Sequence, residues 1–211
     1  IHISADCSDI ILIRQTIMNN TAIIFAKRNL KLKSVNAKKF ALWLFIVSIC
    51  MLFAGLTSAY IVKKSDGRWL EFEMPSMFLY STLVLVLSSI TMHLTYLKAK
   101  DNSLKAVKIG ITGTAIIALT FFYMQYLAWI DLVAEDVFFV GNPSGSFVYV
   151  FSGLHLAHLI GGLVFLLVIF LDTINYKVHS KNMLAIEMCT TYWHFLGVLW
   201  IYLYIFLVMN N

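Results

Sequence analysis

The sequence predicts an all-α integral membrane protein, built as a bundle of five transmembrane helices. Of its 211 residues, 60% are apolar and only 13% are charged, and the mean hydropathy is +0.82. So few charged residues cannot cover the surface of a soluble domain of this size. Several apolar runs approach the roughly 20 helical residues that cross a bilayer core of about 30 Å. None alternates strictly between polar and apolar residues, which favours helices over a transmembrane barrel.

Five spans follow one another along the chain. They cover approximately residues 40–62, 76–97, 109–130, 147–170 and 184–209. The short loops between them make consecutive helices antiparallel neighbours. Pro75 and Pro143 stand just ahead of the second and fourth spans, where a missing backbone N–H costs little. The longest loop, residues 131–146, contains Gly-Asn-Pro-Ser-Gly and is expected to turn outside the membrane.

The chain is expected to hold one membrane domain, residues 40–211, behind a cytoplasmic tail of residues 1–39. The tail has short apolar stretches followed by a basic block, and it lacks the small-residue cleavage site of a signal peptide. Met18 is a normal start position, so residues 1–17 are expected to extend upstream of the working protein.

Basic residues predict the orientation. With the N-terminus inside, the inner segments hold thirteen of the sixteen Lys and Arg residues, and the outer ones hold Lys63, Lys64 and Arg68. The N-terminus is therefore predicted to be cytoplasmic and the C-terminus outside. Because the basic groups flank helix ends, where they meet anionic lipid, the net charge of +5 does not indicate a nucleic-acid partner.

Polar side chains inside the spans are the candidates for function, because they are costly in lipid. They are His93, Gln125, His155, His158, Glu187 and His194. His155 and His158 are three residues apart and share nearly one helix face, so each can bond to a neighbouring helix or a lipid headgroup. A shared metal would need further ligands, which this span does not supply.

Histidines on several spans also raise the alternative of an independent b-type haem protein. Such a protein needs facing histidines at matched depth. His93 is predicted near the inner end of its span and His194 nearer mid-membrane, so we expect no two matched pairs. A small transporter is a further alternative, but no broken helix or inverted repeat supports it.

Small residues predict a packing seam on the fourth span. Gly153, Ala157 and Gly161 recur at intervals of four, with Gly162 adjacent, and a leucine at Gly161 would block a close helix approach. Glu187, near the start of the last span, is either a charge that complements the helix dipole or a functional buried acid. No motif for hydrolysis or phosphate binding is present, so the chain is not expected to perform chemistry alone.

Three stretches resemble subunit III of the haem-copper respiratory oxidases of the cytochrome c oxidase type. They are LFIVSICMLFAGLTSAY at residues 44–60, SGLHLAHLIGG at residues 152–162 (after Gly-Ser-Phe-Val-Tyr at 145–149), and Glu187 followed by Tyr-Trp-His-Phe at 192–195 and Trp200. The resemblance covers roughly residues 40–211. Two acidic positions of the family are occupied here by Ile49 and Gly197. The five spans resemble a shortened form that lacks the family's first two helices.

This resemblance implies an accessory, non-catalytic subunit of a proton-pumping terminal oxidase. It would contain no haem or copper, bind the catalytic subunit I, stabilise it during oxygen reduction and hold phospholipid in a bacterial cytoplasmic membrane. Other oxidase subunits or a respiratory supercomplex would be further partners. The electron donor stays open between cytochrome c and quinol, and a similar accessory subunit of a nitric oxide reductase is an alternative. The candidate lipid or subunit contacts are His155, His158, Glu187, Tyr192, Trp193, His194 and Trp200.

Overall fold

The computed structural model describes residues 14–21, 37–67, 69, 72, 74–101, 103–174 and 183–210. Its long helices are α2 (Ala37–Lys64), α3 (Met77–Lys100), α4 (Leu104–Ala134), α5 (Pro143–Ile174) and α6 (Leu184–Asn210). These five helices are long and apolar enough to cross a membrane, and the described ranges contain no strand. The predicted all-α, five-span membrane fold is confirmed. The sidedness of the two termini stays a prediction.

The chain divides into two compact units, residues 1–43 and residues 44–211. Within the first unit, residues 14–21 are helical and α2 begins at Ala37. Most of the predicted upstream extension, residues 1–13, lies outside the described residues. The boundary between tail and membrane domain after residue 39 also stays a prediction.

The helices continue beyond the predicted spans because long basic side chains favour helix and can extend their charges to the membrane surface. Helix α2 ends on Lys63 and Lys64, and Lys98 and Lys100 lie in the last turn of α3. Helix α4 starts at Leu104, ahead of the predicted residue 109, and takes in Lys105 and Lys108. The helices therefore extend past the apolar core of the bilayer at these ends.

The connection between α4 and α5 is shorter than predicted, because helical structure continues to Ala134 and resumes at Pro143. Asp136 has a φ of 60°, the left-handed conformation that commonly terminates a helix. The Asn142 side-chain oxygen accepts a hydrogen bond from the Ser144 N–H at 2.9 Å and caps the start of α5. A Cβ at Gly145 would lie 2.8 Å from the Phe138 carbonyl oxygen, so this contact requires glycine.

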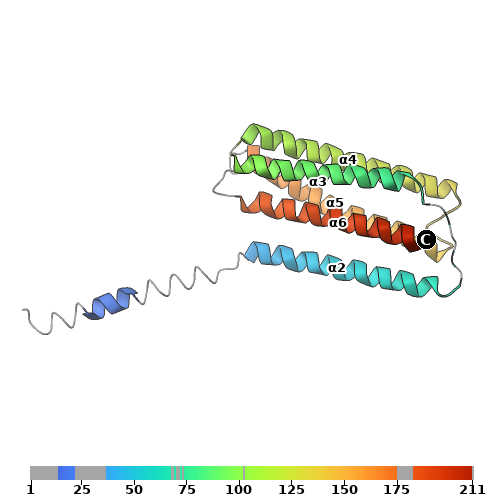
Figure 1. Cartoon of the computed structure of the whole chain (residues 1–211), viewed down its shortest axis with the longest axis horizontal. Coiled ribbons are helices and arrows are strands. Elements are labelled where there is room, and N and C mark those ends of the chain that lie inside the picture. Colours follow the sequence, from blue (N-terminus) through green and yellow to red (C-terminus); the bar gives the residue numbers. More distant parts are fainter. Residues whose placement is uncertain are drawn as a thin grey trace, which may run out of the picture. The chain divides into compact units, whose positions relative to one another are not determined.

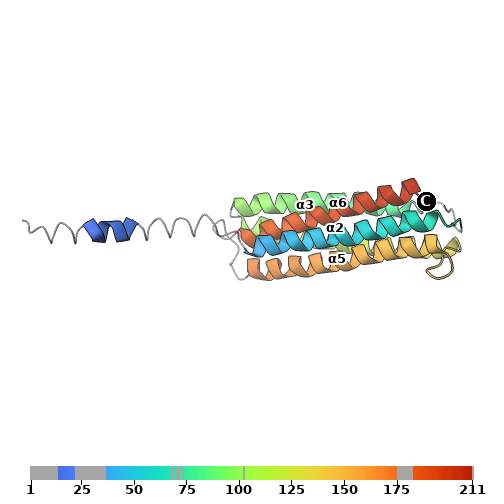
Figure 2. The same ribbon diagram turned by 90° about the horizontal axis from the view of Figure 1, so that it is seen from below.

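The long helices of the second unit run side by side and roughly parallel to one another, as Figures 1 and 2 show. Helix α3 packs against α4 and α6, and α5 packs against α4 and α6. The α3–α4 pair is especially close, because Gly110 faces Thr95 and a Cβ there would collide with the threonine side chain. The hydroxyls of Thr91 and Thr114 lie 3.1 Å apart in the same contact. Small and hydroxyl side chains thus allow these helices to approach.

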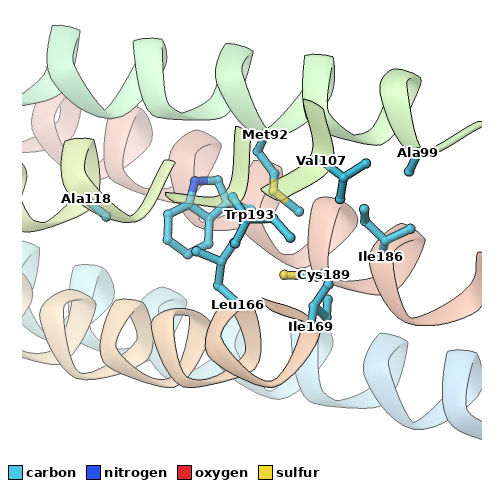
Figure 3. Close-up of a cluster of buried hydrophobic side chains, with 10 residues drawn as sticks. Met92, Ala99, Val107, Ala118, Leu166, Ile169, Ile186, Cys189 and Trp193 are labelled. Carbon is cyan, nitrogen blue, oxygen red and sulfur yellow. The ribbon is translucent and has the colours of Figure 1, made fainter. Parts of the chain in front are cut away.

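The buried apolar core lies among α3, α4, α5 and α6, with the Trp193 ring in its centre (Figure 3). The cluster consists of Met92, Ala99, Val107, Ile111, Ala118, Leu166, Ile169, Ile186, Cys189 and Trp193. Because lipid is as apolar as these side chains, close van der Waals packing contributes more to helix association here than removal from water.

Residues 44–64 of α2 reach α5 and α6 through aromatic side chains. The Tyr60 ring centroid lies 5.5 Å from that of Phe147 and 5.2 Å from that of Phe206. Its hydroxyl donates a hydrogen bond of 3.0 Å to the Asn210 carbonyl at the end of α6. The opposite face of α2 is open, and Met51 is 73% exposed.

The predicted small-residue seam on α5 meets another helix of this chain at one position. A Cβ at Gly162 would lie 3.3 Å from side-chain atoms of Tyr192, Trp193 and Leu196 on α6. Around Gly153 and Gly161, by contrast, a Cβ would meet nothing within 4 Å, and Ala157 is exposed. The four residues therefore do not form one internal seam. A packing role for the three open positions against another chain stays a prediction.

We expect Gly162→Leu to destabilise the protein, because leucine at this site would push α5 and α6 apart. Overpacking of this kind costs about 1–3 kcal/mol. Gly161→Leu, one residue away on an open face, is the matched control and should leave the thermal stability of the purified protein in detergent nearly unchanged. Equal losses in melting temperature for the two variants would contradict this assignment of the α5–α6 contact.

Candidate functional site

The segment at residues 190–200, TTYWHFLGVLW, lies on α6 and contacts every neighbouring helix. Consecutive helical residues point about 100° apart, so Tyr192, Trp193 and His194 face different neighbours. Tyr192 faces α2 and α5, Trp193 and His194 reach α3, and Trp200 meets α3, α4 and α5. We therefore treat this segment and its contacts as the candidate site.

Two indoles fasten α6 to α3. Trp193 Nε1 donates to the Ser88 hydroxyl at 3.1 Å, and Trp200 Nε1 donates to the Thr82 hydroxyl at 3.0 Å. The Thr82 hydroxyl in turn donates to the Phe78 carbonyl of its own helix at 2.7 Å. A buried indole N–H needs an acceptor, and in lipid the acceptor has to come from protein. These bonds fix how α6 is rotated relative to α3.

The same arrangement joins α4 to its neighbours. Gln125 Nε2 donates to the Ser81 hydroxyl of α3 at 2.9 Å, and Trp129 Nε1 donates to the Ser152 hydroxyl of α5 at 3.0 Å. Both serines also donate to carbonyls of their own helices. Sequence reasoning identified Gln125 but missed the serines and Trp129. The available indication was the number of Ser, Thr and Trp residues within apolar spans.

His158 lies between α2 and α5 and is half-buried. Its Nδ1 donates to the Leu154 carbonyl of its own helix at 2.7 Å, and its backbone carbonyl accepts the Tyr192 hydroxyl at 3.1 Å. The rings of Phe45 and Phe53 lie 6.5 and 5.9 Å from the imidazole, centroid to centroid. The expectation that the His158 ring bonds to a neighbouring helix is wrong, because its bond within α5 replaces that contact.

His155 is fully buried and packs as an aromatic ring. Its centroid lies 4.8 Å from the Trp200 ring and 6.1 Å from the Phe121 ring. Neither ring nitrogen has a hydrogen-bond partner in the described part of the chain. The predicted interhelical hydrogen bond of His155 is therefore wrong, because the faces that it meets on α4 and α6 are aromatic.

His93 and His194 lie next to each other across α3 and α6, with ring centroids 5.6 Å apart. The expectation that they occupy different depths is wrong, because the antiparallel register of α3 and α6 brings them level. Nδ1 of His194 is hydrogen-bonded to the Ser89 hydroxyl. Both rings border an open groove of about 600 Å³ between the two helices.

Burial divides the predicted contact residues into two groups. His155, Tyr192, Trp193 and Trp200 are at most 4% exposed, which argues against direct contact with lipid or another subunit. His158, Glu187 and His194 are half-buried, and their outward contacts stay predictions. Glu187 lies in the first turn of α6, where a carboxylate complements the helix dipole.

Neither of the two positions at which the resembled family has an acidic residue carries an ionisable group in this chain. Ile49 is a buried residue of α2, 2% exposed, and Gly197 lies beside Ser89 in the α3–α6 groove. Within the described ranges, no three His, Cys, Asp or Glu side chains gather where they could hold a metal ion.

Fold and site together define a multi-pass helical membrane protein whose interior polar groups join its own helices. The model of the family described as cytochrome c oxidase subunit III matches residues 29–210. The chain therefore belongs to the cytochrome c oxidase subunit III family, and it is an accessory subunit of a haem-copper oxidase. This family carries no redox cofactor and associates with other oxidase subunits.

Relatives come from two kinds of oxidase. Subunit 3 of the cytochrome bo(3) ubiquinol oxidase of Buchnera aphidicola (subsp. Schizaphis graminum) is 26% identical over 83% of this chain and 95% of its own length. Subunit 3 of the cytochrome c oxidase of Bacillus sp. PS3 is 26% identical over 84% of this chain and 87% of its own. The Corynebacterium diphtheriae cytochrome c oxidase subunit 3 is 26% identical over 76% and 82%, respectively.

We expect His155→Phe to preserve stability, because phenylalanine keeps the aromatic contacts with Phe121 and Trp200 and removes two unpaired nitrogens. His155→Ala should instead leave a cavity and cost roughly 2–5 kcal/mol, by analogy with other large-to-small core changes. Thermal unfolding of the two purified variants in one detergent measures the difference. A loss in His155→Phe as large as that in His155→Ala would show that the imidazole nitrogens are needed.

Proposed function

We propose that this chain binds the catalytic subunit I of a proton-pumping terminal oxidase in a bacterial cytoplasmic membrane and stabilises it during turnover. The observation that carries this proposal is the family match over residues 29–210, which includes all five long helices entirely. The oxidase would reduce oxygen to water with electrons that pass through haem and copper in its other subunits. A respiratory supercomplex is a further assembly in which such a subunit can take part.

The internal contacts support a scaffolding role. The indole N–H groups of Trp129, Trp193 and Trp200 donate hydrogen bonds to other helices of this chain, so they are not directed toward a substrate. A bundle joined in this way presents its outer faces in a fixed arrangement. That rigidity suits a subunit whose contribution is a surface for a neighbour.

Phospholipid is a proposed ligand of the outer surface. A groove of about 370 Å³ between α4 and α5 is lined almost entirely by apolar side chains, among them Ile111, Leu119, Leu163, Leu167 and Phe170. Its lining offers acyl chains an apolar contact along two helices. Lipid bound there would fill the groove on the outer face of α4 and α5.

We do not propose that protons move through this chain at Ile49 or Gly197, where the resembled family has acidic residues. Ile49 and Gly197 have no group that exchanges a proton, and the side chain of Ile49 is buried. Any support that this chain gives to proton uptake would therefore act by shaping or stabilising subunit I.

The electron donor has two candidates. We infer cytochrome c, in keeping with the name of the matching family and of the Bacillus relative. Quinol is the second candidate, and the Buchnera relative, a ubiquinol oxidase subunit by name, supports it. Oxygen uptake by the purified complex with reduced cytochrome c or with a quinol distinguishes the two donors.

The function is tested by purifying the oxidase through a tag on the catalytic subunit, with and without this chain. We expect the complex without the chain to keep its haem spectrum and initial turnover but to lose activity faster during sustained oxygen reduction. Restoring the chain should restore the slower decay. An unchanged decay in its absence would contradict the proposed stabilisation.

A pyridine haemochrome assay on the isolated chain tests the alternative of an independent b-type haem protein. We expect no haem signal beyond that of a mock purification. Stoichiometric haem retained through purification would overturn the accessory assignment.

A further inference from the structure

The groove between α3 and α6 is lined by two histidines and a serine among apolar side chains. It runs past Val86, Ser89, Ile90, His93 and Leu94 on α3 and past His194, Gly197, Val198 and Ile201 on α6. These positions recur at intervals of three and four residues on each helix, so they form one continuous strip. The strip extends roughly 12 Å along α3.

The imidazoles of His93 and His194 in this groove are polar groups in an apolar span, which is energetically unfavourable. His93 lies seven residues before the end of α3 at Lys100, roughly 10 Å along the axis, which puts it inside the apolar part of the span. Its ring is exposed on the outer face of the bundle. Polar groups at this depth normally face protein or a water-filled cavity rather than lipid.

The two rings have hydrogen-bonding capacity that this chain does not use. Ser89 engages Nδ1 of His194. Nε2 of His194 and both nitrogens of His93 have no hydrogen-bond partner among the described residues. Each neutral imidazole carries one donor and one acceptor, and acyl chains can satisfy neither.

The shape of the groove suits a helix. Ile90, Leu94 and Val198 are at least 50% exposed and form apolar rims on both sides. Gly197 contributes no side chain to the floor, which lets a facing backbone approach closely. Apolar rims around a polar floor match a transmembrane helix that carries one polar side chain.

We propose that the α3–α6 groove receives a transmembrane helix of another oxidase subunit, and that this helix places an accepting side-chain oxygen against His93 and His194. A carboxylate is the favoured acceptor, because a charge-assisted hydrogen bond is the stronger one. This inference rests on the proposed function, since it names the face by which the chain joins the oxidase. The apolar α4–α5 groove remains for lipid.

Photo-crosslinking in intact membranes tests the docking face. A photoreactive amino acid replaces Val198 in the α3–α6 groove or, as the matched control, Val164 in the α4–α5 groove; the two side chains are 66% and 56% exposed. We expect irradiation to join position 198 to another membrane subunit of the oxidase, identified by mass spectrometry, and position 164 to form no comparable protein adduct. Absence of a protein adduct at position 198 in an assembled complex would overturn the proposal.

Substitutions test the chemistry of the groove. We expect Val198→Trp, which fills it, and His93→Leu, which removes the imidazole, each to lower recovery of the tagged chain with the haem-bearing subunits by about tenfold, the change produced by roughly 1.4 kcal/mol. Val164→Trp should change recovery less than twofold, on the order of 0.4 kcal/mol. His93→Gln, which retains a donor and an acceptor, should recover part of the loss. Immunoblots of the membranes confirm equal amounts of each variant.

Co-purification distinguishes a failure of the proposed function from a failure of the proposed docking face. If the unaltered chain does not co-purify with haem-bearing subunits, the proposed function fails. If it does co-purify, and neither Val198→Trp nor His93→Leu lowers its recovery, the docking face proposed here fails while the proposed function stands.

Discussion

The structure depends on one constraint, that a polar group within the bilayer is costly unless it finds a partner in protein. Hydroxyl side chains satisfy this constraint by accepting a hydrogen bond from one helix while donating another within their own helix. Thr82 accepts the Trp200 indole N–H from α6 and donates to the Phe78 carbonyl of α3, and Ser152 similarly links the Trp129 indole to a carbonyl of α5. Each such pair joins two helices and leaves no indole N–H in lipid. The rotation and register of the four packed helices follow from these pairs.

The same constraint separates the inner residues from the outer ones. Trp193 and Trp200 have partners on neighbouring helices and are buried, so they organise this chain rather than its contacts. His93 is exposed at membrane depth without a hydrogen-bond partner among the described residues. The buried indoles make this chain's scaffold rigid, and the exposed imidazole is available to a proposed neighbour.

The resemblance to the subunit III family leaves two of its acidic positions without an acid in this chain. At the two positions where the sequence resemblance places acids of the family, this chain has Ile49, buried on α2, and Gly197, which follows the Tyr-Trp-His-Phe stretch. The helical scaffold persists without those charges because its helices are joined by indoles, hydroxyls and small residues. The helical scaffold therefore does not require acidic side chains at these two positions.

The sequence by itself determined the class of fold, the five spans and the family resemblance, because each depends on local composition and on patterns within one segment. It also identified the histidines and Gln125 as exceptional, since polar residues are rare in apolar spans. It could not determine which residues meet. The pairing of His93 with His194, the aromatic surroundings of His155, and the difference between Gly161 and Gly162 depend on the rotation and register of helices far apart in the chain. One residue turns a helix face by about 100°, so small differences in packing decide whether a side chain faces a neighbour or lipid, and only the tertiary structure fixes them.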